Sequence, residues 1–240
     1  MELSKKAKCT CIIPFYNENP QRVVGVIKTI LKVKNISDVI CIDDGSVSSD
    51  ARDEIVKEKL GVNLIILKKN TGKAEAVNTA LESVTTDYVI LIDADLINID
   101  SKEIEDTVAL ILNNPIIDMI IFRRIKELFY IKLLRWDILI SGERVLKTDD
   151  LRQILKDKPH GYLLEYAINR YMMKEKKKVF WVSSAGENIY KIYKYGFVKG
   201  FLHDVKIHID ITRYVGIVFL IRCFMFFCRE NAVDYVKKQK

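Results

Sequence analysis

The first 122 residues alternate between unbroken apolar runs and segments with apolar residues at helical spacing. The apolar runs fall at 8–15, 38–44, 62–69, 87–95 and 116–122. A run without polar alternation is typical of a strand covered on both faces, as in a parallel sheet. The helical spacing falls at 19–33, 48–60, 70–84 and 101–114. This alternation predicts an α/β fold with a mostly parallel, Rossmann-like sheet and helices on both faces.

The pattern becomes less regular after residue 122. Residues 123–160 are basic and mixed, 161–178 have the spacing of an amphipathic helix, and 179–184 read as a late strand. No Pro/Gly/Ser-rich linker, internal repeat or low-complexity tract divides the chain. We therefore expect one domain over residues 1–200.

Residues 201–240 are expected to form an amphipathic helical extension of that domain. The apolar stretch from Tyr214 to Cys228 is shorter than the ~20 residues of a membrane-spanning helix, and it carries Arg222 in its middle. Such a helix is buried in the protein, pairs with a second copy as a homodimer, or rests on a bilayer surface. On a bilayer, the basic residues near the headgroups would be Arg222, Arg229, Lys237 and Lys238.

Composition and cysteine usage indicate a globular cytoplasmic protein. The chain has 240 residues, 49% hydrophobic and 30% charged, which is enough to bury a sizeable core. The N-terminus lacks the pattern of a secretory signal peptide. The five cysteines are an odd number and are scattered through apolar segments. They are expected to be free thiols that pack in the core.

Charge is divided unevenly along the chain. Residues 1–120 hold 14 Lys and Arg against 19 Asp and Glu, a net charge of −5, whereas residues 121–240 hold 25 against 13, a net charge of +12. Solvated helix faces can produce this asymmetry. It also fits a metal site beside a surface that receives diphosphates, lipid phosphates or a membrane, and we expect no nucleic-acid partner.

Polar residues follow three of the predicted strands. Tyr16 comes after the first, Asp44 after the second, and Asp93 and Asp95 at the end of the fourth. The carboxyl ends of parallel strands share one edge, where ligands bind. Residues two apart in an extended chain face the same way, so the last two carboxylates are expected to share one small, hard cation.

The same residue types suit a nucleotide diphosphate. Tyr16 offers a ring on which a base can stack, and Asp44 can accept a hydrogen bond from a base. Lys73 follows Gly72 at the start of a predicted helix, where positive charge and backbone amides both favour phosphate. Each residue also has a structural alternative. Tyr16 is consistent with ordinary packing, Asp44 with a turn and helix cap, and Lys73 with a solvated side chain.

Rival enzyme classes fit the motifs less well. A haloacid-dehalogenase-like phosphatase would place the D-x-D strand at the start of the domain, and a sugar nucleotidyltransferase would have a Gly-rich loop after the first strand. The segment PFYNEN at 14–19 contains no glycine. The dinucleotide fingerprint and the P-loop are also absent.

Four ordered motifs resemble the N-terminal half of family 2 glycosyltransferases with the GT-A fold. They are CIIPFYNENPQRV, VICIDDGSVSSD, NTGKAEAVNTAL and DYVILIDADL. The resemblance makes residues 1–122 the nucleotide-sugar-binding half and 123–200 the acceptor half of a GT-A domain. It implies an inverting transferase that uses Mg²⁺ or Mn²⁺, and the DADL form is similar to the branch that acts on polyprenyl phosphates.

By the same resemblance, individual residues acquire expected roles. Pro14, Tyr16, Glu18 and Asp44 would bind the nucleoside of the donor, and Lys73 would lie near the donor. Asp93 would contact the ribose or sugar, and Asp95 together with Asp93 would bind the metal. The segment SGERVLKTDDLRQIL resembles the acceptor side, which implicates Gly142, Glu143 and Arg144. Glu165 stands where the family carries its catalytic acid, although Tyr166 follows it in place of the usual Asp.

Glu165 also has a purely structural interpretation, as an acid that complements the dipole at a helix start. The run GYLLE resembles a retaining relative, the glucosyl-3-phosphoglycerate synthases, so retention of configuration is an alternative. A non-catalytic module that binds a membrane surface or a partner is another alternative.

The sequence predicts transfer of a sugar from a nucleotide sugar, with UDP favoured, to a saccharide or a polyprenyl- or lipid-linked acceptor of the cell envelope. This would take place in the cytoplasm or peripherally on the inner face of the membrane.

Overall fold

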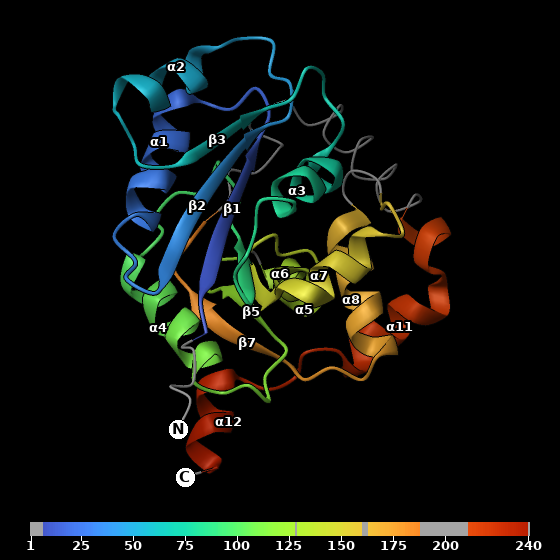
Figure 1. Ribbon diagram of the computed structural model, residues 1–240. Coiled ribbons are helices and arrows are strands. Elements are labelled where there is room, and N and C mark those ends of the chain that lie inside the picture. The colour runs from blue at the N-terminus through green and yellow to red at the C-terminus, as the bar shows by residue number, and fades with distance from the viewer. Residues whose placement is uncertain (1–6, 128, 160–162, 188–210, 240) are drawn as a thin grey trace.

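A mixed sheet forms the centre of the molecule (Figure 1). The structure is a computed structural model that describes residues 7–127, 129–159, 163–187 and 211–239. Within these ranges the sheet has seven strands in the order β3-β2-β1-β4-β6-β5-β7. They are β1 (Cys9–Phe15), β2 (Ile36–Asp43), β3 (Asn63–Ile66), β4 (Tyr88–Leu91), β5 (Met119–Arg124), β6 (Arg144–Lys147) and β7 (Val179–Ser184). Only β6 runs antiparallel to its neighbours, β4 and β5, among these strands.

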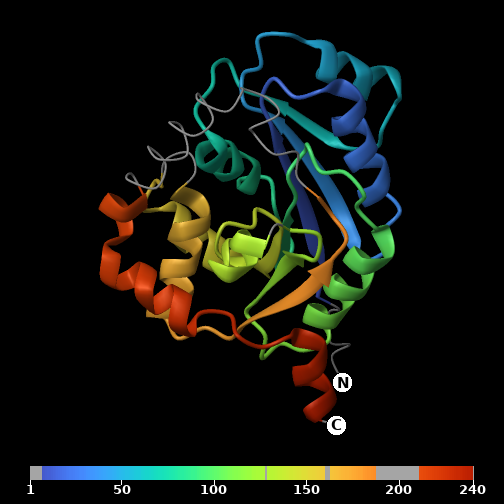
Figure 2. The ribbon, with the colours of Figure 1, turned by 180° about the vertical axis from the view of Figure 1, so that it is seen from behind.

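Helices cover both faces of this sheet, as Figures 1 and 2 show from opposite sides. One apolar cluster joins the sheet to α1 (Pro20–Ile30), α2 (Asp50–Lys57), α4 (Ser101–Leu112) and α12 (Ala232–Lys238). The other joins it to α3 (Lys73–Leu81), α6 (Trp136–Leu139), α7 (Thr148–Leu155), α8 (Leu164–Lys174) and α11 (Ile217–Phe226). A short helix, α5 (Phe129–Leu133), precedes α6. The predicted α/β fold is confirmed.

Local sequence explains why several elements start where they do. Asn19 caps α1 by accepting a hydrogen bond from the Arg22 amide, and Pro20 follows at the first helical position, where its missing N–H costs nothing. Asp100 caps α4 in the same way, through the amide of Lys102. All seven residues of β1 are buried, which is why its sequence is an unbroken apolar run.

Two expectations about strands are wrong. The fourth strand was expected to extend to Asp95, but β4 ends at Leu91 and the two aspartates lie in the following turn. Strand β6 was not anticipated, because it is only four residues long and carries charged residues at both ends. Its antiparallel insertion between β4 and β5 brings the segment before it, including Gly142, beside the turn after β4.

The cysteine prediction is confirmed. All five thiols are free and buried, and Cys9 and Cys11 lie on the same side of the sheet, as strand alternation requires. The predicted helix at 161–178 is observed as α8, which ends at Lys174; its expected start at Gly161 lies outside the described residues, as does the expected boundary between residues 200 and 201. No helix in the described ranges has the length and hydropathy of a membrane span.

Candidate active site

The turns after β1 and β2 are tied to each other at the carboxyl edge of the sheet. The amide of Asn17 donates to Ser46 Oγ (2.8 Å), and the amide of Val47 donates to Asn17 Oδ1 (2.9 Å). Asn17 adopts a left-handed conformation (φ 50°), which asparagine tolerates better than most residues. This link fixes the loop that carries Tyr16 and Glu18.

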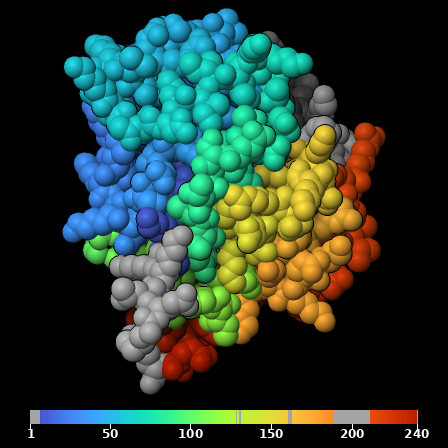
Figure 3. Space-filling view, viewed as in Figure 1, coloured from blue at the N-terminus to red at the C-terminus, as the bar shows by residue number. Residues whose placement is uncertain are grey.

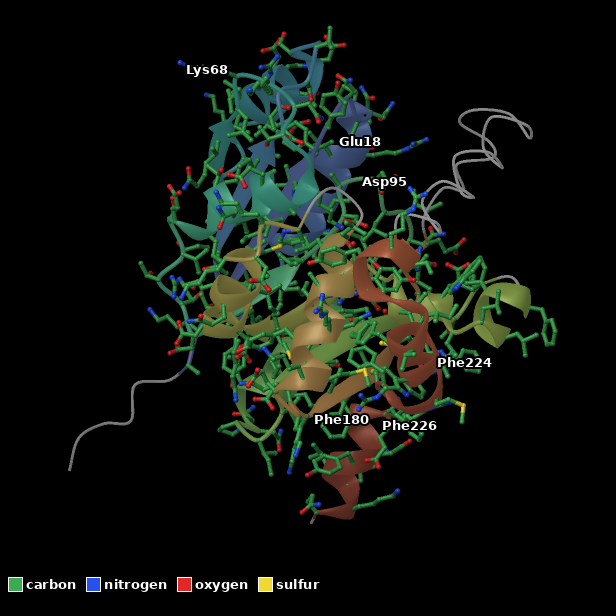
Figure 4. All side chains as sticks on the ribbon, turned by 90° about the vertical axis from the view of Figure 1, so that its right-hand side faces the viewer. Glu18, Lys68, Asp95, Phe180, Phe224 and Phe226 are labelled. Carbon is green, nitrogen blue, oxygen red and sulfur yellow. The ribbon has the colours of Figure 1, made fainter. Side chains whose placement is uncertain are left out.

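The predicted nucleoside residues start from this loop. Pro14 is buried within β1, whereas Tyr16 is 41% exposed immediately beyond the strand, so its ring is available for stacking. Glu18 is half-buried in the same loop. Figure 4 shows Glu18 and Asp95 in the same upper region of the molecule, above the helices of the second half.

Asp44 organises the loop in front of α3. Its Oδ1 accepts hydrogen bonds from the Thr71 amide (2.7 Å) and the Thr71 hydroxyl (2.8 Å), and its Oδ2 accepts one from the Gly72 amide (2.8 Å). The residue is only 4% exposed. Because a carboxylate offers about four acceptor positions, Asp44 retains capacity for a further donor while it holds this loop.

Asp43 is a structural residue that the sequence did not single out. Its Oδ2 pairs with Arg52 Nε (3.1 Å), and its Oδ1 accepts from the Ser46 amide (2.8 Å). In the pair Asp43–Asp44, the first residue therefore anchors the turn to α2 and the second anchors it to α3. Alternation along β2 is the signal that could have separated them, since neighbouring residues point to opposite faces.

Asp93 turns toward the interior of the site. The strand-alternation argument for a shared face with Asp95 does not apply, because both residues follow the end of β4. A Cβ atom added to Gly142 would lie 2.8 Å from Asp93 Cγ. Real Cβ atoms do not approach that closely, so glycine at position 142 makes room for the Asp93 carboxylate.

Lys73 connects Asp93 to Glu165. Its Nζ lies 2.6 Å from Asp93 Oδ1 and 2.8 Å from Glu165 Oε1. Burial opposes the positive charge of Lys73, but the two carboxylates outweigh burial and raise the pKa of Lys73 above its ordinary value. The side chains are 24% exposed for Lys73 and 10% for Glu165, so this charge cluster is largely shielded from solvent.

The segment that carries Lys73 lies between the two halves of the chain. Figure 3 shows the green region around α3 with the blue and cyan N-terminal residues on one side and the yellow residues of the second half on the other. Lys73 is the first residue of α3, after Gly72 at φ 91°. Glu165 lies in the first turn of α8. One lysine thus joins the predicted donor half to the predicted acceptor half.

Glu143 and Asp93 form a carboxyl pair. Burial, followed by the charge of Asp93, raises the pKa of Glu143, whereas Lys73, Arg124 and a hydrogen bond with Glu143 outweigh burial and lower the pKa of Asp93. The Ser141 hydroxyl donates to Glu143 Oε2 (2.9 Å), while Oε1 is buried without a donor. A proton on Glu143 would give Oε1 a donor toward the neighbouring Asp93 carboxylate and would remove the repulsion between two buried negative charges.

Arg144 does not reach the surface, unlike a residue that touches an acceptor. It is fully buried, and its guanidinium donates to the Ser141 carbonyl, to Asn169 Oδ1 (3.0 Å) and to the carbonyl of Glu165 (3.5 Å). Burial lowers the pKa of Arg144. Arg144 therefore positions the first turn of α8, and the acceptor role expected for its side chain is replaced by a supporting one.

Carboxylates are the residues that suit a hard divalent cation at this edge. Within the described residues, no cluster of three or more His, Cys, Asp or Glu side chains forms a ready-made metal site. Mg²⁺ is commonly held by one or two carboxylates together with substrate phosphates. Asp95, half-buried in the turn after β4, suits a site of that kind, whereas Asp93, two residues before it, is paired with Lys73 in this structure.

Curated relatives match only part of this chain. An uncharacterized glycosyltransferase, YaiP, of Escherichia coli (strain K12) is 38% identical over 93 residues, covering 38% of this chain and 23% of that protein. The undecaprenyl-phosphate 4-deoxy-4-formamido-L-arabinose transferase of Proteus mirabilis (strain HI4320) is 32% identical over 99 residues, covering 38% of this chain and 30% of that protein. The matched region is therefore less than a third of either relative.

Solved structures share the fold. Glucosyl-3-phosphoglycerate synthase from Mycobacterium tuberculosis in complex with Mn²⁺, uridine-diphosphate and phosphoglyceric acid superposes with a TM-score of 0.61. The alignment covers 76% of this chain and 72% of that one at 20% sequence identity. This similarity extends to the second half of the sheet, beyond the four sequence motifs.

The family model for glycosyl transferase family 2 matches residues 10–176. That range begins within β1 and ends just after α8, so it includes the turns after β1, β2 and β4 as well as Lys73 and Glu165. The match spans more than half of the chain and confirms the family resemblance of the motifs. The chain belongs to glycosyl transferase family 2.

Proposed function

We propose that this protein transfers a sugar from a nucleotide-diphosphate sugar to an acceptor hydroxyl, with a divalent cation and inversion at the anomeric carbon. The observation that carries the proposal is the double ion pair of Lys73 with Asp93 and Glu165. It places a cation suited to phosphate in direct contact with a carboxylate suited to proton transfer, 2.8 Å apart. Movement of Lys73 toward donor phosphates would free Glu165 for an acceptor hydroxyl in the same crevice.

On the donor side, the carboxyl edge of the sheet supplies the binding groups. The exposed ring of Tyr16 would stack on the base, and the remaining acceptor capacity of Asp44 would receive a base N–H. Asp95 and Asp93 would hold Mg²⁺ or Mn²⁺, which would neutralise the departing diphosphate. Lys73 would contribute a second positive charge to the same phosphates.

On the acceptor side, Glu165 would act as the general base. In the structure, the Glu165 carboxylate is occupied by the Lys73 ammonium, which lies 2.8 Å from its Oε1. Attraction of Lys73 toward the donor diphosphate would weaken the pair. Glu165 Oε1 would then accept the proton of the attacking hydroxyl. Donor binding and activation of the base would thus be coupled through one lysine.

Uridine is the nucleotide that the comparisons favour, and a lipid-linked or saccharide acceptor is the class we propose. The Mycobacterium tuberculosis complex contains Mn²⁺ and uridine-diphosphate. The Proteus mirabilis relative is named for undecaprenyl phosphate. A cytoplasmic enzyme of cell-envelope polysaccharide synthesis would use a uridine-diphosphate donor together with a lipid-linked acceptor.

A thermal-shift panel tests the donor site. UDP-, GDP-, CDP- and dTDP-sugars would be compared with and without Mn²⁺ on wild type, on Asp95→Ala and on Asp106→Ala, a control that removes an exposed carboxylate from α4. A donor at 100 times its Kd should raise Tm by about 5–10 °C. We expect a shift with UDP-sugars that requires Mn²⁺ and is lost only in Asp95→Ala. An equal shift in Asp95→Ala would contradict the metal assignment, and no shift with any donor would favour a non-catalytic module.

A further inference from the structure

Helix α11 exposes most of its apolar side chains. Residues 217–226 read IVFLIRCFMF, and Cys223 is the buried residue of this helix. The exposed members are Ile217 (63%), Val218 (68%), Ile221 (58%), Phe224 (39%), Met225 (50%) and Phe226 (68%). The expectation that this segment is buried within the chain is wrong for these side chains. A row of this size on one helix is typical of a surface that contacts another protein or a membrane.

The helix is held firmly against the rest of the protein. The guanidinium of Arg135 donates to four carbonyls at the end of α11, those of Cys223 (3.3 Å), Phe224 (3.2 Å), Phe227 (2.8 Å) and Cys228 (2.8 Å). Cys223 Sγ lies 3.4 Å from Met173 Sδ of α8. These contacts fix the inner side of α11 and leave the apolar row facing outward. Figure 4 shows α11 on the side toward the viewer, with Phe224 and Phe226 along it.

A second exposed apolar group lies on the segment that carries Arg135. Phe129 is 80% exposed, Leu133 59% and Leu134 40%. These residues belong to α5 and the turn after it, immediately before the arginine that binds the end of α11. We call the exposed apolar residues of α5, its following turn and α11 the apolar face.

The two segments that form the apolar face carry only positive charges, whereas Glu127, Asp137 and Glu230 lie just beyond their ends. Residues 211–229 contain Arg213, Arg222 and Arg229 and no acidic residue, and residues 129–136 contain Lys132 and Arg135 and no acidic residue. A groove of about 460 Å³ opens at the Phe226 end of α11. Its charged lining residues are Lys176, Lys177, Lys178, Arg229 and Glu230, so positive charge predominates there. Exposed apolar side chains with arginines and lysines at their margins match an anionic lipid surface.

A second copy of the chain fits this face less well. In a symmetric dimer the same patch meets itself, so Arg222 of each copy would enter an interface made of this one apolar face. Neither segment of the face supplies an acidic residue to pair with it. In contrast, phosphate groups of a bilayer would pair with all three arginines while the apolar side chains enter the acyl boundary.

We propose that the apolar face docks the protein onto an anionic membrane, with α11 lying in the plane of the interface. The consequence for the reaction rests on the proposed function. Cys223 of α11 lies against Met173 of α8, with the two sulfur atoms 3.4 Å apart, and Glu165 lies in the first turn of the same helix. Docking therefore places the helix that carries the proposed base at the membrane, where a lipid-linked acceptor resides. A soluble acceptor would have no need of this placement.

Vesicle co-flotation tests the docking without donor or metal. The full chain would be mixed with vesicles of phosphatidylcholine alone or of phosphatidylcholine with added phosphatidylglycerol, whose negative surface potential attracts basic segments. We expect flotation with the anionic vesicles. The double variant Ile221→Ser/Phe226→Ser should bind at least about tenfold more weakly, and Arg222→Gln about fivefold more weakly with a reduced dependence on salt.

A matched control changes apolar residues of equal exposure elsewhere. Val56 (66%) on α2 and Ile66 (51%) on β3 are exposed, and Val56→Ser/Ile66→Ser should float as wild type does. Equal flotation of the two double variants would overturn the proposal. Wild type that stays off anionic vesicles but sediments as a dimer, which Ile221→Ser/Phe226→Ser dissociates, would assign the face to a second copy instead. Donor-induced thermal shifts on the same variants report on the proposed function separately.

Discussion

Lys73 Nζ and Glu165 Oε1 form an ion pair 2.8 Å long, although the two residues are 92 positions apart in the chain. The same ammonium lies 2.6 Å from Asp93 Oδ1. Lys73 begins α3, which packs against β1 and β2, whereas Glu165 lies in the first turn of α8 in the second half. Movement of this one lysine side chain therefore affects a carboxylate from each half of the chain.

Replacing Lys73 should destabilise the fold and abolish donor binding. In Lys73→Met the Asp93 and Glu165 carboxylates lose their shared cation while remaining largely buried, which typically costs about 3–5 kcal/mol. Chemical denaturation would measure the loss, and nucleotide-sugar titration would measure binding. Lys102→Met is the matched control, since its partner Asp106 lies in solvent and the midpoint should hardly change. A Lys73→Met protein as stable as the control would contradict the inference that Lys73, Asp93 and Glu165 form a charge cluster shielded from solvent.

Gly142→Ala tests the close approach of Gly142 to Asp93. The added methyl group would lie 2.8 Å from Asp93 Cγ, so the carboxylate must move away from Lys73. We expect a loss of about 1–3 kcal/mol, typical of overpacking, together with weaker donor and metal binding. Gly25→Ala is the control, because it lies within α1 with open space around its Cβ position and should gain about 0.5–1 kcal/mol. Unchanged metal binding in Gly142→Ala would show that the position of Asp93 is unimportant.

Glu165→Gln should separate donor binding from transfer. Glutamine can still accept a hydrogen bond from Lys73, so the fold and the donor-induced thermal shift should persist. It cannot take the proton of the acceptor, and turnover should fall by about 10²–10⁴. Glu175→Gln at the exposed end of α8 is the control and should turn over normally. Retained turnover would exclude Glu165 as the base, and NMR of the wild-type product would distinguish inversion from retention.

Sequence patterns predicted the framework of this fold well. Continuous apolar runs located β1, β2 and β5, because strands covered on both faces leave no room for polar residues. The same reasoning extended the predicted fourth strand to Asp95, although β4 ends at Leu91. The apolar run continues up to Ile92, so no polar residue marks the end of the strand. Strand β6 was missed because a four-residue strand with charged ends has no period to detect.

The partners of the site residues were beyond the reach of sequence reasoning. Residue types identified Lys73, Asp93 and Glu165 individually, but their meeting depends on how α8 packs against the first half, which no local pattern encodes. Arg144 was expected at the acceptor because its segment, SGERVLKTDDLRQIL, resembles the acceptor side of the family. Its burial is explained by Asn169 and the Ser141 carbonyl, which lie 25 residues after it and three before it.

Glu143→Gln should make the protein relatively more stable as pH rises. Burial and Asp93 raise the pKa of Glu143 above its ordinary 4.5, so the folded state holds a proton that the unfolded chain releases above that pH. Wild type therefore loses the stability contributed by this group as pH rises from 4.5 through the folded-state pKa. Glutamine keeps a hydrogen-bond donor for Asp93 without titrating. With chelator present, the Tm of Glu143→Gln minus that of wild type should be smallest at pH 4 and increase toward pH 8. Glu127→Gln, which removes the carboxylate that pairs with Arg124, is the control and should show no such rise. A difference independent of pH would mean that Glu143 carries no shared proton with Asp93.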